Sequence, residues 1–196
     1  MSTQEDMPIL VFRIALMYVE PGIWRRFRFP AHLTLDRLHR AVQIVMGWED
    51  EHLYEFSRGK ERYGVPDRES RMFGVQTENA KKVTVASLNL RRRSPLHYLY
   101  DFGDSWEHEL RVEDVLTAPD DLPTVWCLEG ARACPPEDCG SVPGYEELVR
   151  ILRDPSDPEY ESMVEWCGGD YDPEAFHLGV VNERLRRSFR ARATPR

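Results

Sequence analysis

Apolar and polar positions alternate with a period of two near the amino terminus of the chain. Residues 9–19, "ILVFRIALMYV", place large apolar side chains at every second position and their single charge, Arg13, on the other face. After a short "EPG" segment, residues 23–29, "IWRRFRF", alternate again between apolar and arginine-containing positions. This period predicts two strands, each with at least one buried face.

The period changes to that of a helix in residues 35–46, "LDRLHRAVQIVM". Its apolar stripe is formed by Leu35, Leu38, Val42, Val45 and Met46. Thr34 is a suitable N-cap, and Gly47 can end the helix in the left-handed conformation. His39 is expected to be a partly exposed neighbour of this stripe.

Alternation returns in three further segments. Residues 52–57, "HLYEFS", predict a strand, and "RGKERYG" after them predicts a turn. Residues 97–101, "HYLYD", and 106–116, "WEHELRVEDVL", are alternating runs separated by "FGDS", which predicts a β-hairpin. Residues 66–95 lack a clear pattern, and the three consecutive arginines at 91–93 predict a solvated loop or a phosphate contact.

Helix signals dominate the last third of the chain. "GYEELVRILRD" carries a short apolar stripe, and Asp157-Pro158 and Asp172-Pro173 each place an N-cap before a proline at the first helical position. The whole pattern predicts an α+β fold. We expect a mostly antiparallel β-sheet packed against one helix in the N-terminal half and three C-terminal helices.

The domain is expected to span residues 8–187. Residues 1–7 are predicted to be a disordered N-terminus and residues 188–196 a basic C-terminal tail. The length of 196 residues, with 41% hydrophobic and 31% charged residues, suits one globular domain. No apolar run is long enough for a membrane helix, and the polar amino terminus does not resemble a secretion signal. We therefore expect a cytoplasmic protein with no membrane contact.

Charge is distributed unevenly along the chain. Residues 101–174 hold 21 of the 34 acidic residues but only 4 of the 26 basic ones. The two parts can fold onto each other with complementary surfaces, or they can form an acidic cleft and a separate basic face. A net charge of −8 argues against a dominant nucleic-acid groove, which needs a basic excess.

Two acidic clusters are candidates for chemistry. Asp101, Asp104 and His108 lie on the predicted hairpin, and Glu137 and Asp138 follow two stiff prolines in "CPPEDCG". Together they are candidate catalytic and metal-ligating residues, because carboxylates and imidazole bind divalent metals that organise hydrolysis. The same carboxylates can instead cap turns and helix termini.

Two further groups of residues suggest binding. Cys127, Cys134 and Cys139 are candidate zinc ligands, although no C-x-x-C spacing supports them and reduced thiols are the alternative. The arginines that interleave with aromatic residues near the amino terminus can stack on nucleic acid, or they can cover the solvent face of an edge strand. The candidate partner-binding residues are Trp24, Arg25, Arg26 and Arg28.

Known catalytic motifs are missing. The Asp-Phe-Gly at residues 101–103 does not indicate a protein kinase, because no Gly-rich phosphate loop or H-R-D motif precedes it. The chain also lacks a G-x-S-x-G elbow, an H-E-x-x-H helix and a Walker loop.

Five motifs in this order resemble the plasmid pRiA4b ORF-3-like family. They are "PGIWRRFRFP", "LDRLHRAVQIVMGWEDEHLYEF", "YLYDFGDSWEHELRVEDVL", "CLEGARACPPEDCG…PGYEEL" and "DYDPEAFHLGVVNERL". The resemblance covers residues 8–186, with Ser141 replacing the second of two glycines usual after the P-P-E-D segment. It implies a single α+β domain with an antiparallel sheet, and relatives on plasmids and mobile elements. It implies no catalytic residue.

Two functional hypotheses follow. The first is a cytoplasmic binding or accessory domain that contacts a protein or nucleic-acid partner. The second is a metal-dependent, hydrolase-like enzyme that uses a divalent metal in an acidic and histidine-containing cleft between the hairpin and the "CPPED" loop. The sequence predicts neither the substrate nor the oligomeric state.

Overall fold

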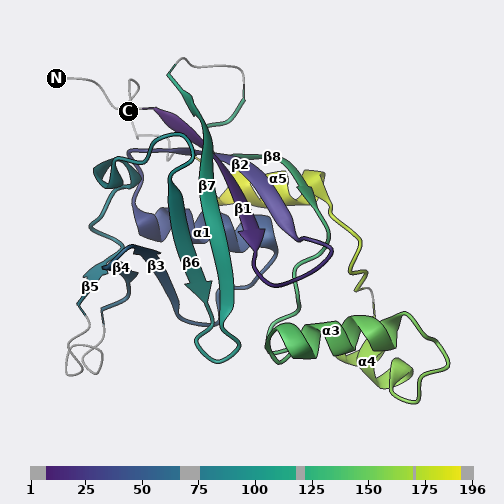
Figure 1. Ribbon diagram of the computed structural model, residues 1–196. Helices are drawn as coiled ribbons and strands as arrows, with labels where there is room; N and C mark the ends of the chain where they lie inside the picture. The colour runs from purple at the N-terminus through teal and green to yellow at the C-terminus, as the bar shows by residue number, and fades with distance from the viewer. Residues whose placement is uncertain (1–7, 67–75, 118–121, 170, 191–196) are drawn as a thin grey trace.

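The computed structural model describes residues 8–66, 76–117, 122–169 and 171–190 (Figure 1). The predicted N-terminal disorder at 1–7 and most of the predicted basic tail lie outside these residues. The strands are β1 (Ile9–Leu16), β2 (Trp24–Pro30), β3 (Tyr54–Arg58), β4 (Glu61–Gly64), β5 (Thr77–Asn79), β6 (Pro95–Tyr100), β7 (Trp106–Leu116) and β8 (Trp126–Ala131). The helices are α1 (Leu35–Met46), the short 3-10 helix η2 (Val85–Leu88), α3 (Ser141–Leu152), α4 (Tyr160–Trp166) and α5 (Leu178–Ser188).

The eight strands form one sheet in the order β5-β4-β3-β6-β7-β1-β2-β8. Every neighbouring pair is antiparallel except β4 and β5, which are parallel. The predicted α+β class is therefore confirmed, with one helix in the N-terminal half and three in the C-terminal half. Among the described residues, no helix combines the length and the apolar character needed to cross a bilayer.

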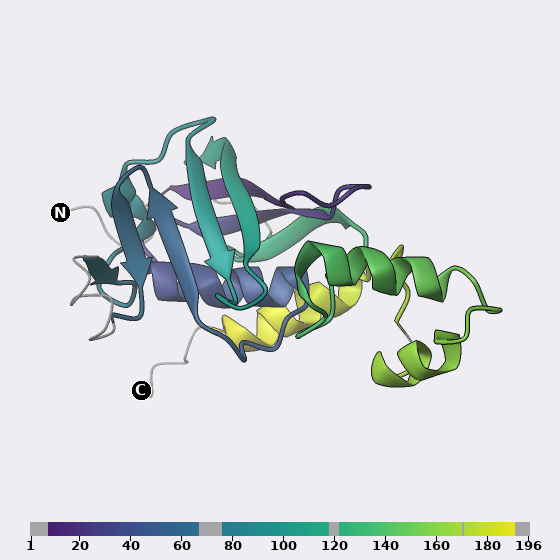
Figure 2. The ribbon, with the colours of Figure 1, turned by 60° about the horizontal axis from the view of Figure 1, so that its bottom comes forward.

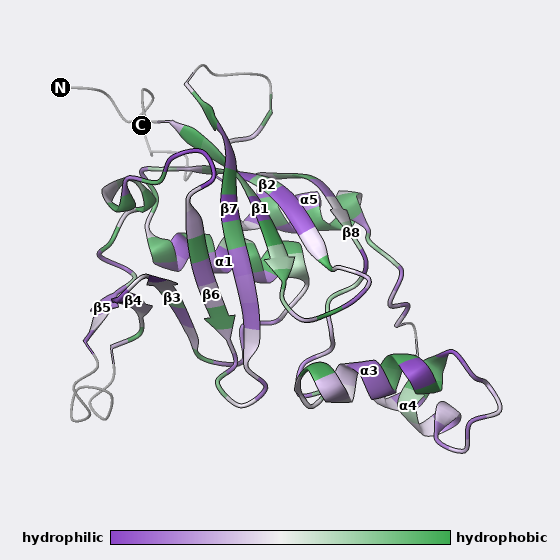
Figure 3. Ribbon diagram, in the orientation of Figure 1, coloured by the Kyte–Doolittle hydropathy of each residue, from purple (hydrophilic) through white to green (hydrophobic). Residues whose placement is uncertain are grey.

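Helices α1 and α5 lie against one face of the sheet, and α3 and α4 form a pair at its side (Figures 1 and 2). The opposite face of β6, β7, β1 and β2 has no helix over it in the described part of the chain. Along the strands, hydrophobic and hydrophilic residues alternate (Figure 3). The sheet therefore has one face in the core and one that meets solvent.

The alternation predicted for the central strands is confirmed. Phe12 and Ile14 on β1 and Leu110 on β7 are fully buried, whereas Arg13 and Arg111 point to the other face. The core is formed where the inward positions of β1, β2, β6 and β7 meet the apolar stripe of α1. Removing these side chains from water is the main stabilising contribution to the fold.

Three strands were not predicted. Residues 61–64, predicted as a turn, form β4, residues 77–79 form the short β5, and residues 126–131 form β8. Pairing with β2 holds β8 in place, and its Gly130 is required there because a Cβ would lie 2.7 Å from Cδ of Arg25. Local alternation does not record such pairing, since β8 packs against a strand about 100 residues earlier.

Helix α1 begins and ends at the predicted residues, but its start is stabilised differently. Thr34 makes no side-chain cap. The free N–H groups of Leu35 and Asp36 donate instead to the carbonyls of Val83 (2.9 Å) and Ala80 (3.2 Å). Gly47 ends the helix with φ 116°, as predicted.

The last helix begins later than the Asp172-Pro173 signal predicts. The Asp172 carboxylate accepts a hydrogen bond from the Glu174 N–H (2.9 Å), but this turn does not continue into a helix. The chain leaves it at Phe176, whose ring lies 4.1 Å from the Arg25 guanidinium carbon, and α5 starts at Leu178. A tertiary contact therefore overrides a local N-cap signal.

The Arg25 guanidinium joins three elements in the core. It extends from β2, is 1% exposed, and donates to the Val45 carbonyl at the end of α1 (2.7 Å). It also donates to the carbonyls of Ala131 (2.7 Å) and Arg132 (2.7 Å), at the end of β8. A cation at the carboxyl end of a helix is favourable, and here it also satisfies carbonyls that have no partner within the helix.

Replacing Arg25 should destabilise the fold strongly. In Arg25→Met, several buried carbonyls lose their donor, and we expect the free energy of unfolding to fall by about 3 kcal/mol or more. Urea denaturation followed by far-UV circular dichroism measures it. Arg187→Met, at an exposed arginine on α5, is the control and should change stability by less than about 0.5 kcal/mol. Equal stability of the two variants would contradict the role given to Arg25.

Two glycines in helices should respond to alanine in opposite directions. A Cβ at Gly144 in α3 would lie 2.0 Å from the carbonyl oxygen of Cys139, whereas a Cβ at Gly179 in α5 would meet nothing within 4 Å. We expect Gly144→Ala to cost about 3 kcal/mol and Gly179→Ala to stabilise by roughly 0.5 kcal/mol. Melting temperatures that rise for Gly179→Ala and fall for Gly144→Ala are the expected result, and a neutral Gly144→Ala would be inconsistent with the close approach.

Candidate functional site

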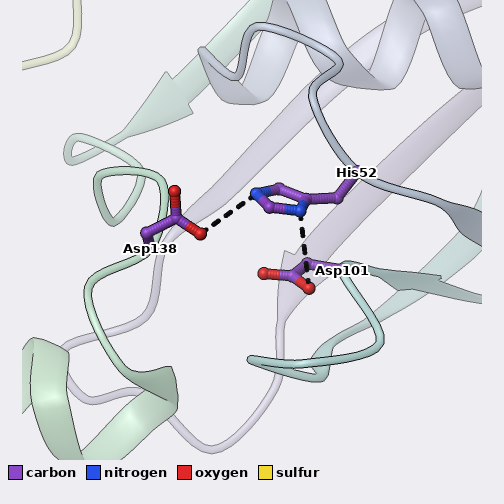
Figure 4. Close-up of side chains that lie close together, drawn as sticks. All are labelled: His52, Asp101 and Asp138. Carbon is purple, nitrogen blue, oxygen red and sulfur yellow. Dashed lines mark ion pairs between the residues drawn. The ribbon is translucent and has the colours of Figure 1, made fainter.

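His52 lies among carboxylates from two distant segments (Figure 4). It occupies the connection between α1 and β3. Its Nδ1 is 3.8 Å from Oδ1 of Asp101, and its Nε2 is 3.2 Å from Oδ1 of Asp138 and 3.8 Å from Oε2 of Glu137. Asp101 begins the hairpin between β6 and β7, and the other two acids belong to the "CPPED" loop between β8 and α3.

Local hydrogen bonds hold Asp101 in place. Its Oδ1 accepts from the N–H of Gly103 (2.8 Å), and its own N–H donates to the carbonyl of Leu53 (3.0 Å). Its backbone is left-handed with φ 56°, a conformation that Asp tolerates better than most residues. The carboxylate is therefore fixed beside His52 and is only 9% exposed.

The "CPPED" loop is attached to the same place through Glu137. One of its oxygens, Oε1, accepts from the hydroxyl of Tyr100 (2.9 Å) and from the N–H of Glu49 (3.1 Å). Before it, the Pro135 carbonyl accepts from Nε1 of Trp48 (3.0 Å). These bonds set the position of the loop and leave the neighbouring Asp138 carboxylate directed at His52.

The second oxygen of Glu137 has no such partner. Oε2 is buried and accepts no hydrogen bond from a described residue, and burial raises the pKa of this carboxyl. Nε2 of His52 is also buried without a hydrogen bond, because its contact with Asp138 is close but lies outside hydrogen-bonding geometry. These two atoms are 3.8 Å apart, and a water molecule or an ion beside them would satisfy both.

The donor atoms are spaced for one small cation. One atom each from His52, Asp101 and Asp138 lie within 4.8 Å of one another, and this is the only such group of three among the described residues. An ion about 2.1 Å from each ligand brings ligand atoms to about 3–4 Å from one another. Asp101 and Asp138 face different nitrogens of His52, so side chains must rotate for both carboxylates to share one ion with a single nitrogen. Asp138 is 69% exposed, which gives the group access from solvent.

The structure brings together three of the five predicted acidic and histidine residues. Asp101, Glu137 and Asp138 surround His52. Asp104 lies beside this group, where its Oδ2 accepts from the N–H of Gly140 (3.0 Å) and joins the hairpin to the loop. Asp104 therefore performs the structural role considered for these carboxylates.

His108 is elsewhere, in the core. It is 1% exposed, its Nδ1 lies 3.0 Å from the Trp106 carbonyl, and its ring meets Trp48 edge-on at 5.1 Å. Burial lowers its pKa to about 3, so the ring is neutral at physiological pH. The inward strand face that carries His108 keeps it away from the carboxylates.

His52 was not among the predicted site residues. It stands at the start of "HLYEFS", which predicts a strand residue, whereas β3 begins only at Tyr54. Three acids, Glu49, Asp50 and Glu51, directly precede it, but nothing local indicates that two loops far along the chain close around it. The only sequence feature that could have indicated His52 is its place in a polar connection within the motif "LDRLHRAVQIVMGWEDEHLYEF".

A second histidine also differs from expectation. His39, predicted to be partly exposed, is 4% exposed. Its Nδ1 lies 2.8 Å from the hydroxyl of Tyr98 and its Nε2 2.6 Å from Asp50, while Gln43 donates to the same hydroxyl (2.9 Å). This hydrogen-bond network joins α1 to β6. Because Tyr98 is buried, the network stabilises the packing of α1 on the sheet.

The cysteines do not gather into a metal site in the described part of the chain. Cys127 and Cys134 are buried, and Cys139 is half-buried. The group of three potential ligands contains no cysteine. Burial raises the pKa of Cys127 to about 11, which keeps it a neutral thiol. Zinc binding by these residues stays a prediction without geometric support.

The predicted partner-binding row on β2 is not an exposed patch. Arg25 and Arg28 are each 1% exposed, and Trp24 is half-buried. Arg26 is partly exposed and forms ion pairs with Glu113 (2.7 Å) and Glu129 (3.4 Å). Strand alternation places Arg25 in the core and Trp24, Arg26 and Arg28 on the other face, where Arg28 is also buried.

The chain has relatives along nearly its whole length. The family model described as plasmid pRiA4b ORF-3-like protein matches residues 8–179. The uncharacterized protein y4hQ of Sinorhizobium fredii (strain NBRC 101917 / NGR234) is 36% identical over 179 residues, which cover 90% of each chain. The crystal structure of a protein of unknown function, MM3350 from Methanosarcina mazei Go1, superimposes with a TM-score of 0.77 at 33% identity. That match covers 88% of this chain and 97% of the other.

The buried state of His108 predicts a loss of stability in acid. The folded protein keeps this ring neutral down to about pH 3, whereas the unfolded chain takes up a proton near pH 6.5. Stability should therefore fall as pH drops below 6.5, by up to about 1.4 kcal/mol per pH unit from this group. His39, whose pKa burial also lowers, adds to the effect.

Urea unfolding between pH 4 and pH 7 measures this dependence. His108→Leu should give a shallower slope, by up to about one proton, even if its stability at neutral pH is lower. His97→Gln, at an exposed strand position, is the control and should keep the wild-type slope. An unchanged slope in His108→Leu would show that His108 titrates alike in both states.

Proposed function

The chain belongs to the plasmid pRiA4b ORF-3-like family, and for this member we propose a divalent-cation site that serves a hydrolytic reaction. His52, Asp101 and Asp138 are the proposed ligands, and Glu137 is the fourth group beside them. The observation that carries the proposal is the pair of buried atoms, His52 Nε2 and Glu137 Oε2, that face each other without a hydrogen bond.

The chemistry of the ligands favours a particular class of metal. One imidazole with two or three carboxylates suits Mn²⁺ or Zn²⁺, whereas a cage of oxygen atoms alone suits Ca²⁺ or Mg²⁺. A cation here would compensate for the cost of placing the Glu137 carboxylate in a buried position. It would also relieve the repulsion among three carboxylates that converge on one ring.

The surroundings hold both carboxylates in place. Tyr100 donates to Oε1 of Glu137 and leaves Oε2 directed at His52, whereas Gly103 donates to Oδ1 of Asp101, the same oxygen that lies nearest His52. A bound divalent metal activates water or polarises a substrate oxygen. The exposed Asp138 leaves one side of the site open to solvent, where a substrate can approach.

Hydrolysis is the reaction class that we propose for this solvent-accessible site with a bound metal. Glu137, with its raised pKa, can hold or release a proton near the metal at a pH closer to neutral than an ordinary carboxyl. The hypothesis of a non-enzymatic domain that binds a protein or nucleic-acid partner stays a prediction, as does a cytoplasmic location. The arginines of β2 give that hypothesis little support, because Arg25 and Arg28 are buried and Arg26 pairs with Glu113 and Glu129.

Metal binding can be measured on the purified protein after treatment with a chelator. Titration with Mn²⁺, followed by calorimetry and by the electron paramagnetic resonance signal of free Mn²⁺, should show one bound ion per chain. His52→Gln and Asp138→Asn should each weaken the affinity about tenfold or more, because each removes one ligand. A saturating metal should also raise the melting temperature of the wild-type protein.

The matched control is Asp172→Asn, which changes an exposed turn carboxylate in the same way and should leave Mn²⁺ affinity unchanged. Equal affinities of wild type, His52→Gln and Asp138→Asn would contradict the site. The hydrolytic part is tested next with phosphoester, ester and amide substrates in the presence of metal. If the ion binds but none of these substrates is hydrolysed, the metal site is supported and the hydrolase hypothesis is rejected.

A further inference from the structure

Three arginines stand side by side on the face of the sheet that no described helix covers. In the strand register, Arg13 on β1 is directly opposite Arg111 on β7 and directly opposite Arg26 on β2. Directly opposite residues of antiparallel strands have Cβ atoms about 5 Å apart. The row therefore places three arginines across the neighbouring strands β7, β1 and β2, on the face that no described helix covers.

Such a row is unfavourable by itself, because like charges directly opposite one another destabilise a sheet. Carboxylates compensate at its two ends. Arg26 pairs with Glu113 (2.7 Å), and Arg111 donates to Glu109 (2.9 Å). The central Arg13 has no carboxylate partner among the described residues, and its guanidinium instead lies 4.0 Å above the Trp24 ring.

The loop before β6 adds two more arginines to the same place. Arg92 and Arg93 line a surface pocket of about 360 Å³ together with the row, and neither makes an ion pair within the part of the chain that the structure describes. The Arg93 N–H donates to the Val112 carbonyl (2.7 Å), which fixes the loop against β7. The pocket is lined by Arg13, Arg26, Arg92, Arg93, Arg111, Val112, Glu113 and Asp114.

We propose that this pocket binds a compact anion that carries two or more phosphate charges. Five arginines face two carboxylates in the lining, so the pocket has a local positive excess in a protein whose net charge is −8. Guanidinium groups bind phosphate oxygens with two parallel hydrogen bonds, and several of them around one small volume match a di- or triphosphate. Such a ligand would also offset the repulsion among neighbouring arginines that the carboxylates at the two ends leave uncompensated.

The rim of the pocket limits the size of the ligand. Glu109 and Glu129 belong to the same open face and adjoin the two ends of the row. A long polyanion that crosses the sheet must pass these carboxylates, whereas a compact one stays among the arginines. The proposal is separate from the metal site, since the two share no residue.

Binding is tested with tripolyphosphate, ADP and a short oligo(dT) strand as probes, by calorimetry at several salt concentrations. Tripolyphosphate, ADP or both should bind the wild-type protein, and their relative affinities distinguish an inorganic polyphosphate from a nucleotide. Arg13→Gln and the pair Arg92→Gln with Arg93→Gln should each weaken binding about tenfold or more. Arg187→Gln, at an exposed arginine on α5, is the matched control and should bind as the wild type does.

Stability without ligand separates this role from a structural one. If the row exists for an anion, Arg13→Gln removes like-charge repulsion and should leave the melting temperature unchanged or higher. A clear fall would mean that Arg13 is needed for the fold through its contact with Trp24, which would overturn the proposal. It would also be overturned by no binding of tripolyphosphate or ADP at millimolar concentration, or by equal binding to all variants. Tighter binding of oligo(dT) than of both small probes would overturn the compact ligand.

Discussion

The position of the candidate metal site depends on the Arg25 guanidinium in the core. Its hydrogen bonds reach the end of α1 and the last residues of β8, so they define where the chain leaves β8. The "CPPED" loop begins directly after that point, and the loop between α1 and His52 begins at the other end of the same contact. A buried cation that satisfies backbone carbonyls therefore sets the spacing between two loops that carry His52, Glu137 and Asp138.

Charge has two different uses in this protein. On the open face, arginines outside the acidic segment pair with its carboxylates, as Arg26 does with Glu113 and Glu129. This agrees with complementary surfaces between the two parts of the chain. Around His52, carboxylates outnumber the basic side chains near them. In the pocket on the sheet face, arginines outnumber carboxylates. A local negative charge and a local positive charge therefore remain at the two places where ion pairs within the chain do not balance them.

Much of the fold follows from residues next to one another in sequence. The alternation in β1, β2, β6 and β7, the stripe of α1 and the Gly47 helix end each depend on local periodicity or conformational preference, and each is found as predicted. The hairpin that carries Asp101 and Asp104 was predicted for the same reason. Strand β8 and the delayed start of α5 were not, because pairing with β2 and the contact between Phe176 and Arg25 decide them.

The sequence by itself determined the central strands, the first helix, the α+β class and the two acidic segments from which three of the candidate site residues come. Only the tertiary structure decided that Asp101 and Asp138 meet at His52, while His108, four residues after Asp104 on the same hairpin, turns into the core. The alternation of apolar and polar residues distinguishes the two faces of a strand. A loop has no such periodicity, so its sequence does not predict which segments lie beside it. Which side chains share a site is therefore set by packing between distant segments, and this decides which of the charged residues can act together.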